Sequence, residues 1–258
     1  MEKANRRSLI ITRLYKALTV LIICFLMTRP AYGQDSSATT IQLTSPPFIG
    51  RTSGFMGMGF RLNAEEAPKL LPKGIMVKTD QNGLAAGNLE IYRTDQVFGV
   101  PVYTIAFFVI EVKSQDDQHP KEGNWIVWGA INNKEALASF KQFYNLPHHY
   151  SSDIFLESNS ALSKAKVGNT TEGGLELTLE KIDAKPVRAE GLAVILNNSA
   201  TNKVIKVEIP WLAEGHQTDI VSFKINPGNN DALKVLQHIQ PFYTQVSSNV
   251  FSYPKSSE

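Results

Sequence analysis

The chain has 258 residues, with 26 basic and 24 acidic side chains and a single cysteine, Cys24. Residues 1–33, which we interpret as a cleaved segment, contain six of the basic residues and one of the acidic residues. Residues 34–258 therefore contain 20 basic and 23 acidic residues and carry a net charge of −3. This balance gives no reason to expect nucleic acid as a partner. Because no cysteine follows Cys24, these residues can form no disulfide bond and no cysteine-ligated metal site.

The first 33 residues are typical of a secretory signal peptide. Arg6, Arg7, Arg13 and Lys16 precede an uncharged apolar run at 17–27, and Ala31-Tyr32-Gly33 supplies a cleavage site. The run has 11 residues, whereas a membrane-spanning helix needs about 20. We therefore expect cleavage after Gly33, export to the periplasm or medium, and no stable membrane span afterwards. An uncleaved anchor is the alternative interpretation.

The remaining chain is long enough for one sizeable domain. Its small polar residues 34–40 predict a flexible lead, and residues 41–258 predict a single folded domain. Segments rich in β-branched and aromatic residues, separated by Gly, Pro, Asn and Asp, indicate strands. These predicted strands are 75–78, 88–92, 100–112, 125–128, 175–182, 192–196, 204–209 and 220–225.

Three helices are expected among the strands, at 63–71, 132–144 and 231–239. In the second, Asn132 and Glu135 occupy capping positions, and Pro147 is expected to stop the helix. In the first, Asn63 and Glu66 are the capping residues. Many strands and few helices predict an α+β, β-rich domain: an antiparallel, barrel-like sheet with a few short flanking helices.

The most informative segment is Lys141-Gln142-Phe143-Tyr144-Asn145-Leu146-Pro147-His148-His149. It resembles the active-site segment of acetoacetate decarboxylases, in which an Arg-Glu pair is followed by four residues and Pro-Lys-Lys. Further pieces resemble that family in the same order: Leu43-Thr44-Ser45-Pro46, Leu70-Leu71-Pro72, Leu89-Glu90-Ile91 and Tyr103-Thr104. The resemblance covers residues 43–157 well and implies the fold of that family.

The resemblance also implies which side chains line a pocket. In the family one lysine forms an imine with a β-keto acid, and a neighbouring lysine lowers its pKa, an effect that acetoacetate decarboxylase itself exemplifies. Here His148 and His149 stand at both lysine positions, and imidazole has no primary amine. Glu90 matches the first family acid, whereas Ile105 stands where the second would be. Ser53 falls near the place of the family's arginine, for which Arg51 and Arg61 are displaced alternatives, and Lys141 takes the place of the arginine in the Arg-Glu pair.

The candidate catalytic residues are therefore His148, His149 and Glu90, with Tyr103, Ile105 and Pro147 as pocket residues. The two histidines are either acid–base groups or ordinary loop residues. Glu90 is either a pocket carboxylate or a solvent-facing strand residue. We expect the three to meet around one cavity. We expect no metal site, because neighbouring histidines seldom face one ion and a third ligand would have to be His119, His216, His238 or Glu90.

Three functions remain open from the sequence. The first is an exported protein that binds a small carbonyl-containing or apolar ligand in an internal pocket, without imine-based decarboxylation. The second is a lyase or hydratase that uses histidine acid–base chemistry on a keto acid or another carbonyl compound. The third is a structural or interaction protein with a vestigial pocket. No cofactor is expected, since the chain lacks the nucleotide-binding and metalloprotease motifs. By resemblance, a homo-oligomer is an option.

Overall fold

The computed structural model describes residues 43–115, 121–182, 185–198 and 203–255. The predicted signal peptide, the lead at 34–40 and His119 lie outside these ranges. By its internal contacts, Leu43–Glu258 forms one compact unit. Among the described residues, no helix combines the length and the apolar character needed to cross a bilayer.

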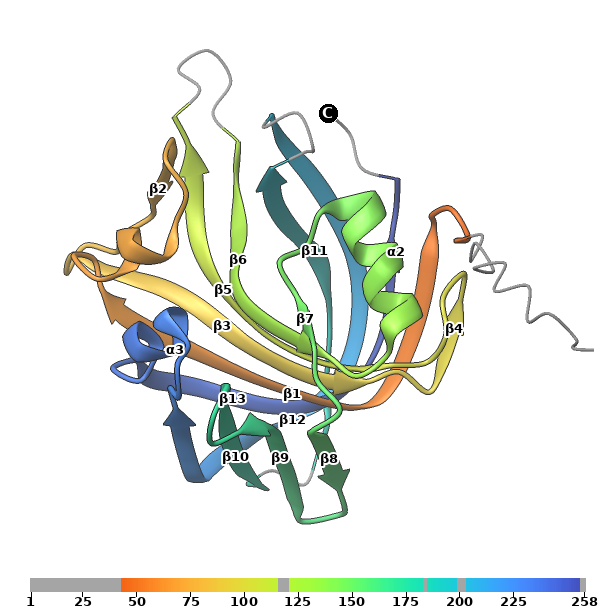
Figure 1. Cartoon of the computed structure of the whole chain (residues 1–258). Helices are drawn as coiled ribbons and strands as arrows, with labels where there is room; N and C mark the ends of the chain where they lie inside the picture. Colours follow the sequence, from red (N-terminus) through yellow and green to blue (C-terminus); the bar gives the residue numbers. More distant parts are fainter. Residues whose placement is uncertain (1–42, 116–120, 183–184, 199–202, 256–258) are drawn as a thin grey trace, which may run out of the picture. The chain divides into compact units, whose positions relative to one another are not determined.

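Seven strands pair in a closed ring, in which each strand is bonded to two others (Figure 1). The ring closes because β11 pairs both with β12 and, over a short parallel stretch at Ile195 and Leu196, with β6. All the other joins of the ring are antiparallel. In ring order the strands are β1 (Phe48–Asn63), β3 (Leu84–Arg93), β5 (Thr104–Ser114), β6 (Glu122–Ile131), β11 (Val187–Asn198), β12 (Val204–Asn226) and β13 (Gln240–Tyr253).

The sheet extends beyond the ring because β12 is long. Its second half pairs with β10 (Gly173–Lys181), which is followed by β9 (Leu162–Asn169) and β8 (Ile154–Ser158). Short strands at β2 (Ile75–Val77), β4 (Gln96–Phe98) and β7 (His149–Tyr150) pair with β5, β1 and β6. The β-rich α+β fold class predicted from the sequence is confirmed.

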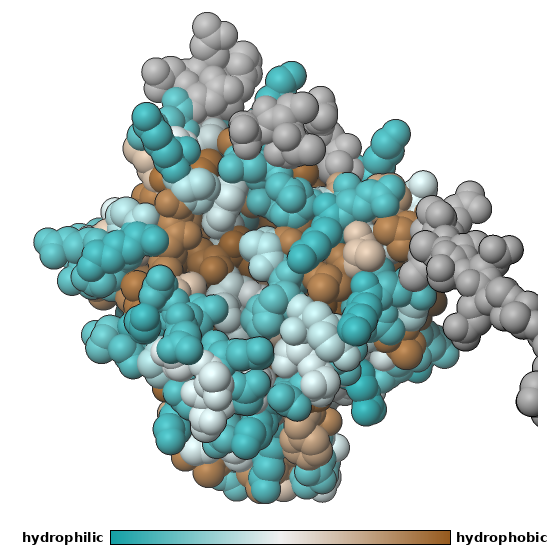
Figure 2. Space-filling model, viewed as in Figure 1, coloured by the Kyte–Doolittle hydropathy of each residue, from teal (hydrophilic) through white to brown (hydrophobic). Residues whose placement is uncertain are grey.

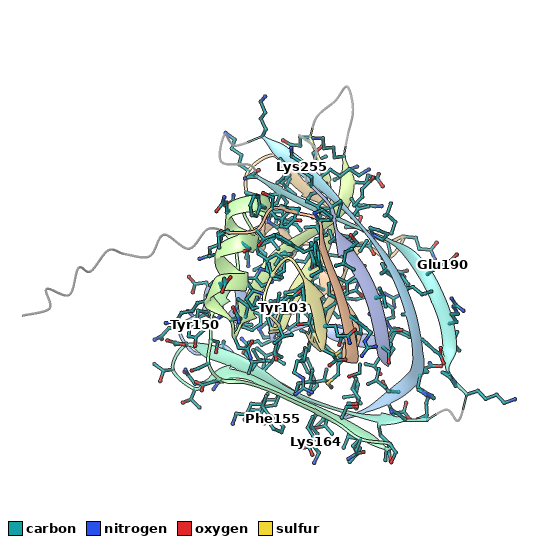
Figure 3. All side chains as sticks on the ribbon, turned by 90° about the vertical axis from the view of Figure 1, so that its right-hand side faces the viewer. Tyr103, Tyr150, Phe155, Lys164, Glu190 and Lys255 are labelled. Carbon is teal, nitrogen blue, oxygen red and sulfur yellow. The ribbon has the colours of Figure 1, made fainter. Side chains whose placement is uncertain are left out.

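The side chains of the ring divide into two apolar clusters, because successive residues of a strand point to opposite faces. Phe108 belongs to the outer cluster, which β9, β10 and the helix α3 (Asp231–Leu236) help to cover. Phe107 belongs to the inner cluster, against which α2 (Lys134–Tyr144) packs. The Tyr103 ring meets the Phe140 ring of α2 at a centroid distance of 5.3 Å, and Figure 3 shows Tyr103 between α2 and the strands.

The N-cap of the helix α2 lies one residue later than the sequence predicts. Asn133 is the N-cap, and its Oδ1 accepts hydrogen bonds from the backbone N–H groups of Glu135 and Ala136. Asn132 is instead a strand-end residue, whose Oδ1 accepts from the Thr104 N–H at 2.7 Å. The helix ends before Pro147, because Asn145 adopts the left-handed conformation at a φ of 50°.

The other expected helices are shorter than predicted. Residues 63–71 contain a 3₁₀ helix, η1 (Ala67–Leu70), with Pro68 in its first turn. The Asn63 Oδ1 accepts from the Glu65 N–H, but the side chain of Glu66, the N-cap residue, makes no capping hydrogen bond. The helix α3 ends at Leu236 rather than at residue 239.

Candidate functional site

A pocket of about 310 Å³ lies against the inner face of the ring. Strands from both halves of the chain contribute to it, β1, β3, β5 and β6 from the first and β11, β12 and β13 from the second. Its aromatic lining consists of Phe55, Tyr92, Phe107, Trp211, Tyr243, Phe251 and Tyr253. Its polar lining consists of Glu90, Asn88, Asn124, Gln245 and Asn249. No lysine, arginine or histidine is among the described residues that line it.

Strand register places Glu90 in the floor of this pocket. Glu90 pairs with Gly57 on one side and with Phe107 on the other, and all three line the pocket. Paired residues of neighbouring strands point to the same face of a sheet. Position 57 has no room for a side chain, since a Cβ atom there would lie 2.8 Å from the Phe55 ring and 3.3 Å from Gln245 Cγ, and both residues line the pocket.

The carboxyl of Glu90 lies in an apolar environment without a counter-ion. It keeps some accessible surface because it borders the pocket, yet burial raises its pKa to about 7 from the ordinary 4.5. Among the described residues, no lysine, arginine or histidine forms an ion pair with it. Glu90 therefore keeps its proton to a higher pH than an ordinary carboxyl does.

Two tyrosines of the pocket lining lie near Glu90. The hydroxyl oxygens of Tyr92 and Tyr253 are 3.5 Å apart. Burial raises the pKa of Tyr253 to about 12 and that of Tyr92 well above its usual value, and the charge of Glu90 raises both further. Both phenols therefore stay neutral, and they offer hydroxyl groups rather than charge.

Aromatic rings form much of the remaining wall. Tyr92 stacks on Phe55 at a centroid distance of 5.8 Å and meets the edge of Phe251 at 5.4 Å. Phe107 contacts the same Tyr92 ring at 6.2 Å. On the face that Figure 2 shows, hydrophobic residues gather near the centre, and hydrophilic residues cover much of the rest.

His148 faces the inside of the ring but does not reach the pocket. It has 2% of its surface exposed, and its ring packs against Phe107 at 5.6 Å. Gly129 makes room for it, because a Cβ atom there would lie 2.6 Å from His148 Cδ2. Neither ring nitrogen has a hydrogen-bond partner in the described part of the chain. Burial, with smaller contributions from His149 and Lys141, lowers the pKa of His148 to about 3, so the ring is neutral.

His149 lies on the opposite face of the sheet from His148. Its ring contacts Trp128 of the outer cluster at 5.5 Å, and burial lowers its pKa. The expectation that His148, His149 and Glu90 surround one cavity is therefore wrong in its geometry. His149 is the first residue of the short strand β7 and His148 directly precedes it, so the two rings lie on opposite faces, against Trp128 and Phe107. The Phe107 ring stands between His148 and the pocket that Glu90 lines.

The three residues expected in the pocket wall also lie elsewhere. Tyr103 stands behind Tyr92, with its ring centroid 6.2 Å away. Ile105 pairs with Tyr92 and is 1% exposed, so it belongs to the core under α2. Pro147 is exposed at the surface. Tyr103 and Ile105 thus support the pocket from behind, whereas Pro147 does not contribute to it.

None of the basic residues considered from the sequence lines the pocket. Lys141 is exposed on α2. Arg51 is exposed and pairs with Val250 across β1 and β13. Arg61 lies 3.5 Å from Asp80 and covers the Phe242 ring. Ser53 is exposed as well.

The sequence reasoning missed the contribution of the C-terminal half. Trp211, Phe251 and Tyr253 line the pocket from β12 and β13, beyond the segment that resembles the family. The alternation Phe251-Ser252-Tyr253 was the available signal, since it places both rings on one face of a strand. Within the described ranges, no group of three metal-ligating side chains lies close enough to hold an ion.

Solved structures share this architecture. The acetoacetate decarboxylase of Legionella pneumophila superposes with a TM-score of 0.64 at 10% identity, over 83% of this chain and 87% of its own. An acetoacetate decarboxylase-like enzyme of Sphingomonas wittichii RW1 follows with a TM-score of 0.56 at 12% identity, over 81% and 92%. This chain has the acetoacetate decarboxylase fold. The enduracididine biosynthesis enzyme MppR, in its complex with pyruvate, also matches, with a TM-score of 0.54 at 9% identity, over 86% and 93%.

The likeness is one of fold. No protein-family model matches the chain, and no curated protein matches it in sequence. At about a tenth of residues identical, the acetoacetate decarboxylase fold carries over, while the chemistry has to be argued from the side chains present.

Proposed function

We propose that the protein is exported and binds a small organic molecule in the pocket that Glu90 lines, without forming an imine with it. The observation that carries this proposal is the lining itself: aromatic and apolar walls with a few polar groups, at a size of about 310 Å³. Concave pockets that combine aromatic and apolar walls with a few polar groups are the usual ligand sites of proteins. Export rests on the basic lead, the short apolar run and Ala31-Tyr32-Gly33.

The absence of a suitable amine argues against imine chemistry. An imine forms from a primary amine, and no lysine is among the described residues that line the pocket. His148 and His149, which by resemblance stand at the family's two lysine positions, have no such group. Incubation with acetoacetate and borohydride should therefore give no covalent adduct and no carbon dioxide, whereas a lysine adduct would contradict the proposal.

A second function, proton transfer on the bound ligand, is favoured by one observation. A carboxyl with a pKa of about 7 can act as either acid or base at neutral pH, and Glu90 has that value. In this function Glu90 acts without His148 or His149. In deuterated water, proton transfer would exchange protons of the ligand for deuterium, and Glu90→Gln should abolish this exchange. Binding alone would give no exchange in either protein.

Native mass spectrometry of the purified protein tests the binding function. The wild type should carry a small molecule at one copy per chain, released on denaturation. Ala193→Leu should abolish this, because Ala193 lines the pocket and a larger side chain fills it. Ala189→Leu is the matched control, since Ala189 lies on the same strand but is exposed. Equal occupancy in both variants, or an empty wild type, would contradict the proposal.

A further inference from the structure

The charge of the pocket indicates what kind of molecule it accepts. Glu90 is the one ionisable carboxyl among the described lining residues, and no basic side chain lines the pocket to neutralise it. An anionic ligand, such as the carboxylate of a keto acid, would meet a partly negative wall without any basic group to bind it. A cationic ligand would instead supply the missing counter-ion in a poorly solvated environment, where charge pairing is strongest.

The aromatic lining favours the same class of ligand. Aromatic faces attract organic cations, and cages of aromatic rings are a recurrent way in which proteins bind quaternary ammonium groups. Here Phe55, Tyr92, Trp211, Phe251 and Tyr253 line the same pocket as Glu90. Tyr92 is the centre of this group, with Phe55 stacked on it and Phe251 against its side.

We propose that the ligand of this pocket carries a protonated or quaternary ammonium group, which pairs with the carboxylate of Glu90 and packs against the surrounding aromatic rings. The inference rests on the proposed binding function and narrows it to organic cations. Glu90 lines the pocket and keeps part of its surface accessible, so its carboxylate can be reached from the pocket.

Glu90 is the group whose titration should make ligand binding depend on pH near neutrality, because the other groups that face it are phenols or uncharged. Its strand contributes Tyr92, and β13 contributes Tyr243 and Tyr253, all of which are phenols. The paired strands contribute Gly57 and Phe107, and β11 and β12 contribute no charged group to the lining. A bound cation favours the ionised carboxylate, so the cation binds more tightly as pH rises and the carboxyl releases its proton.

Calorimetric titration with two probes of the same shape tests the inference. Choline is a permanent cation, and 3,3-dimethylbutan-1-ol is its neutral carbon analogue. At pH 8, choline should bind at least about tenfold more tightly than the neutral analogue. The affinity for choline should fall about tenfold from pH 8 to pH 6, because Glu90 takes up its proton. The affinity of the neutral analogue should not fall over that range.

Two variants make the test specific. Glu90→Gln should weaken choline binding about tenfold at pH 8 and remove its pH dependence, while the neutral analogue binds as before. Glu157→Gln is the control, because Glu157 is an exposed acid on β8, away from the pocket. Trp211→Leu, which keeps Glu90, should lower the affinity for choline more than the affinity for the neutral analogue.

The outcomes separate the two proposals. Equal or tighter binding of the neutral analogue would overturn the cation inference and leave the binding function standing. Choline binding that is unchanged in Glu90→Gln would also overturn the inference. Failure of both probes to bind would overturn the cation inference, and an empty wild type by native mass spectrometry would then remove the binding function as well.

Discussion

Glu90 combines burial with ionisation, and this combination has a cost in stability. Its pKa is raised to about 7, so the folded state holds the proton more tightly than the unfolded state does. The resulting stability is complete below the ordinary value of 4.5 and is lost as pH rises through 7. Above pH 7 the buried carboxyl therefore destabilises the empty protein.

Replacing this carboxyl should reverse that cost. Without ligand, Glu90→Gln should be more stable than the wild type at pH 8, by up to about 3 kcal/mol, and nearly equal to it at pH 4.5. Urea unfolding at both pH values measures the difference, with Glu157→Gln as the control. A difference that does not change with pH would show that Glu90 is not buried as described.

His148 has the opposite linkage, since burial lowers the pKa of a base. Its stabilising contribution as a neutral ring is complete above about 6.5 and is lost as pH falls towards 3. His148→Leu should therefore resist acid better, gaining about 3 kcal/mol relative to the wild type between pH 7 and pH 4. It should also be no less stable at pH 7, because two buried nitrogens without partners are removed. The exposed His238 provides the control variant, His238→Leu, in which an imidazole is removed from the surface instead of the core.

At the residue scale, the sequence offered the pocket lining as one location for Glu90, but it did not predict which side chains surround the two histidines. Glu90 lines the pocket, in agreement with the first of its two interpretations. The two histidines are adjacent in sequence, yet one faces Phe107 and the other faces Trp128. That outcome depends on β7 pairing with β6, a contact that no local pattern in the sequence encodes.

At the scale of elements, α2 depends on its cap. Asn133→Ala should destabilise the protein by about 1 kcal/mol, because the N–H groups of Glu135 and Ala136 lose their side-chain acceptor. Thermal unfolding measures this, and Asn133→Ser, which keeps an acceptor, should recover most of the loss. An unchanged melting temperature in Asn133→Ala would contradict the assignment of the cap.

Element types were predictable where the pattern was strong, and boundaries were not. Capping patterns located α2 to within a few residues, but Asn132 and Asn133 are equivalent in type, and the bond from the Thr104 N–H to Asn132 decides between them. Two predicted strands, 204–209 and 220–225, are one strand, β12. Its middle contains Pro210, Glu214, Gly215 and His216, which interrupt the local signal, while pairing with β11 and β13 keeps the backbone extended.

At the scale of the whole molecule, the closed ring follows from contacts distant in sequence. The sequence predicts a β-rich domain, whereas the join of β6 to β11 brings together Asn124 and Ile195, about 70 residues apart. The extension through β8, β9 and β10 over the outer cluster was likewise not predictable from strand content. The pocket exists because this ring closes, with strands of both halves in its wall.

Export of the protein predicts a shortened N-terminus, which the mass of the intact protein tests. The protein recovered from the periplasm or medium should begin at or near Gln34, because Ala31-Tyr32-Gly33 provides the small residues that cleavage requires. Intact-mass spectrometry measures the N-terminus directly. A product that retains Met1 and sediments with membranes would contradict this and favour the uncleaved anchor.

The central claim, that the pocket beside Glu90 is a ligand site, is tested most directly by a crystal structure of the purified protein without added ligand. We predict electron density for a small molecule within the pocket, in contact with the Glu90 carboxyl and the Tyr92 ring. A pocket that contains only ordered water, or one that is filled by side chains of the protein itself, would contradict the claim.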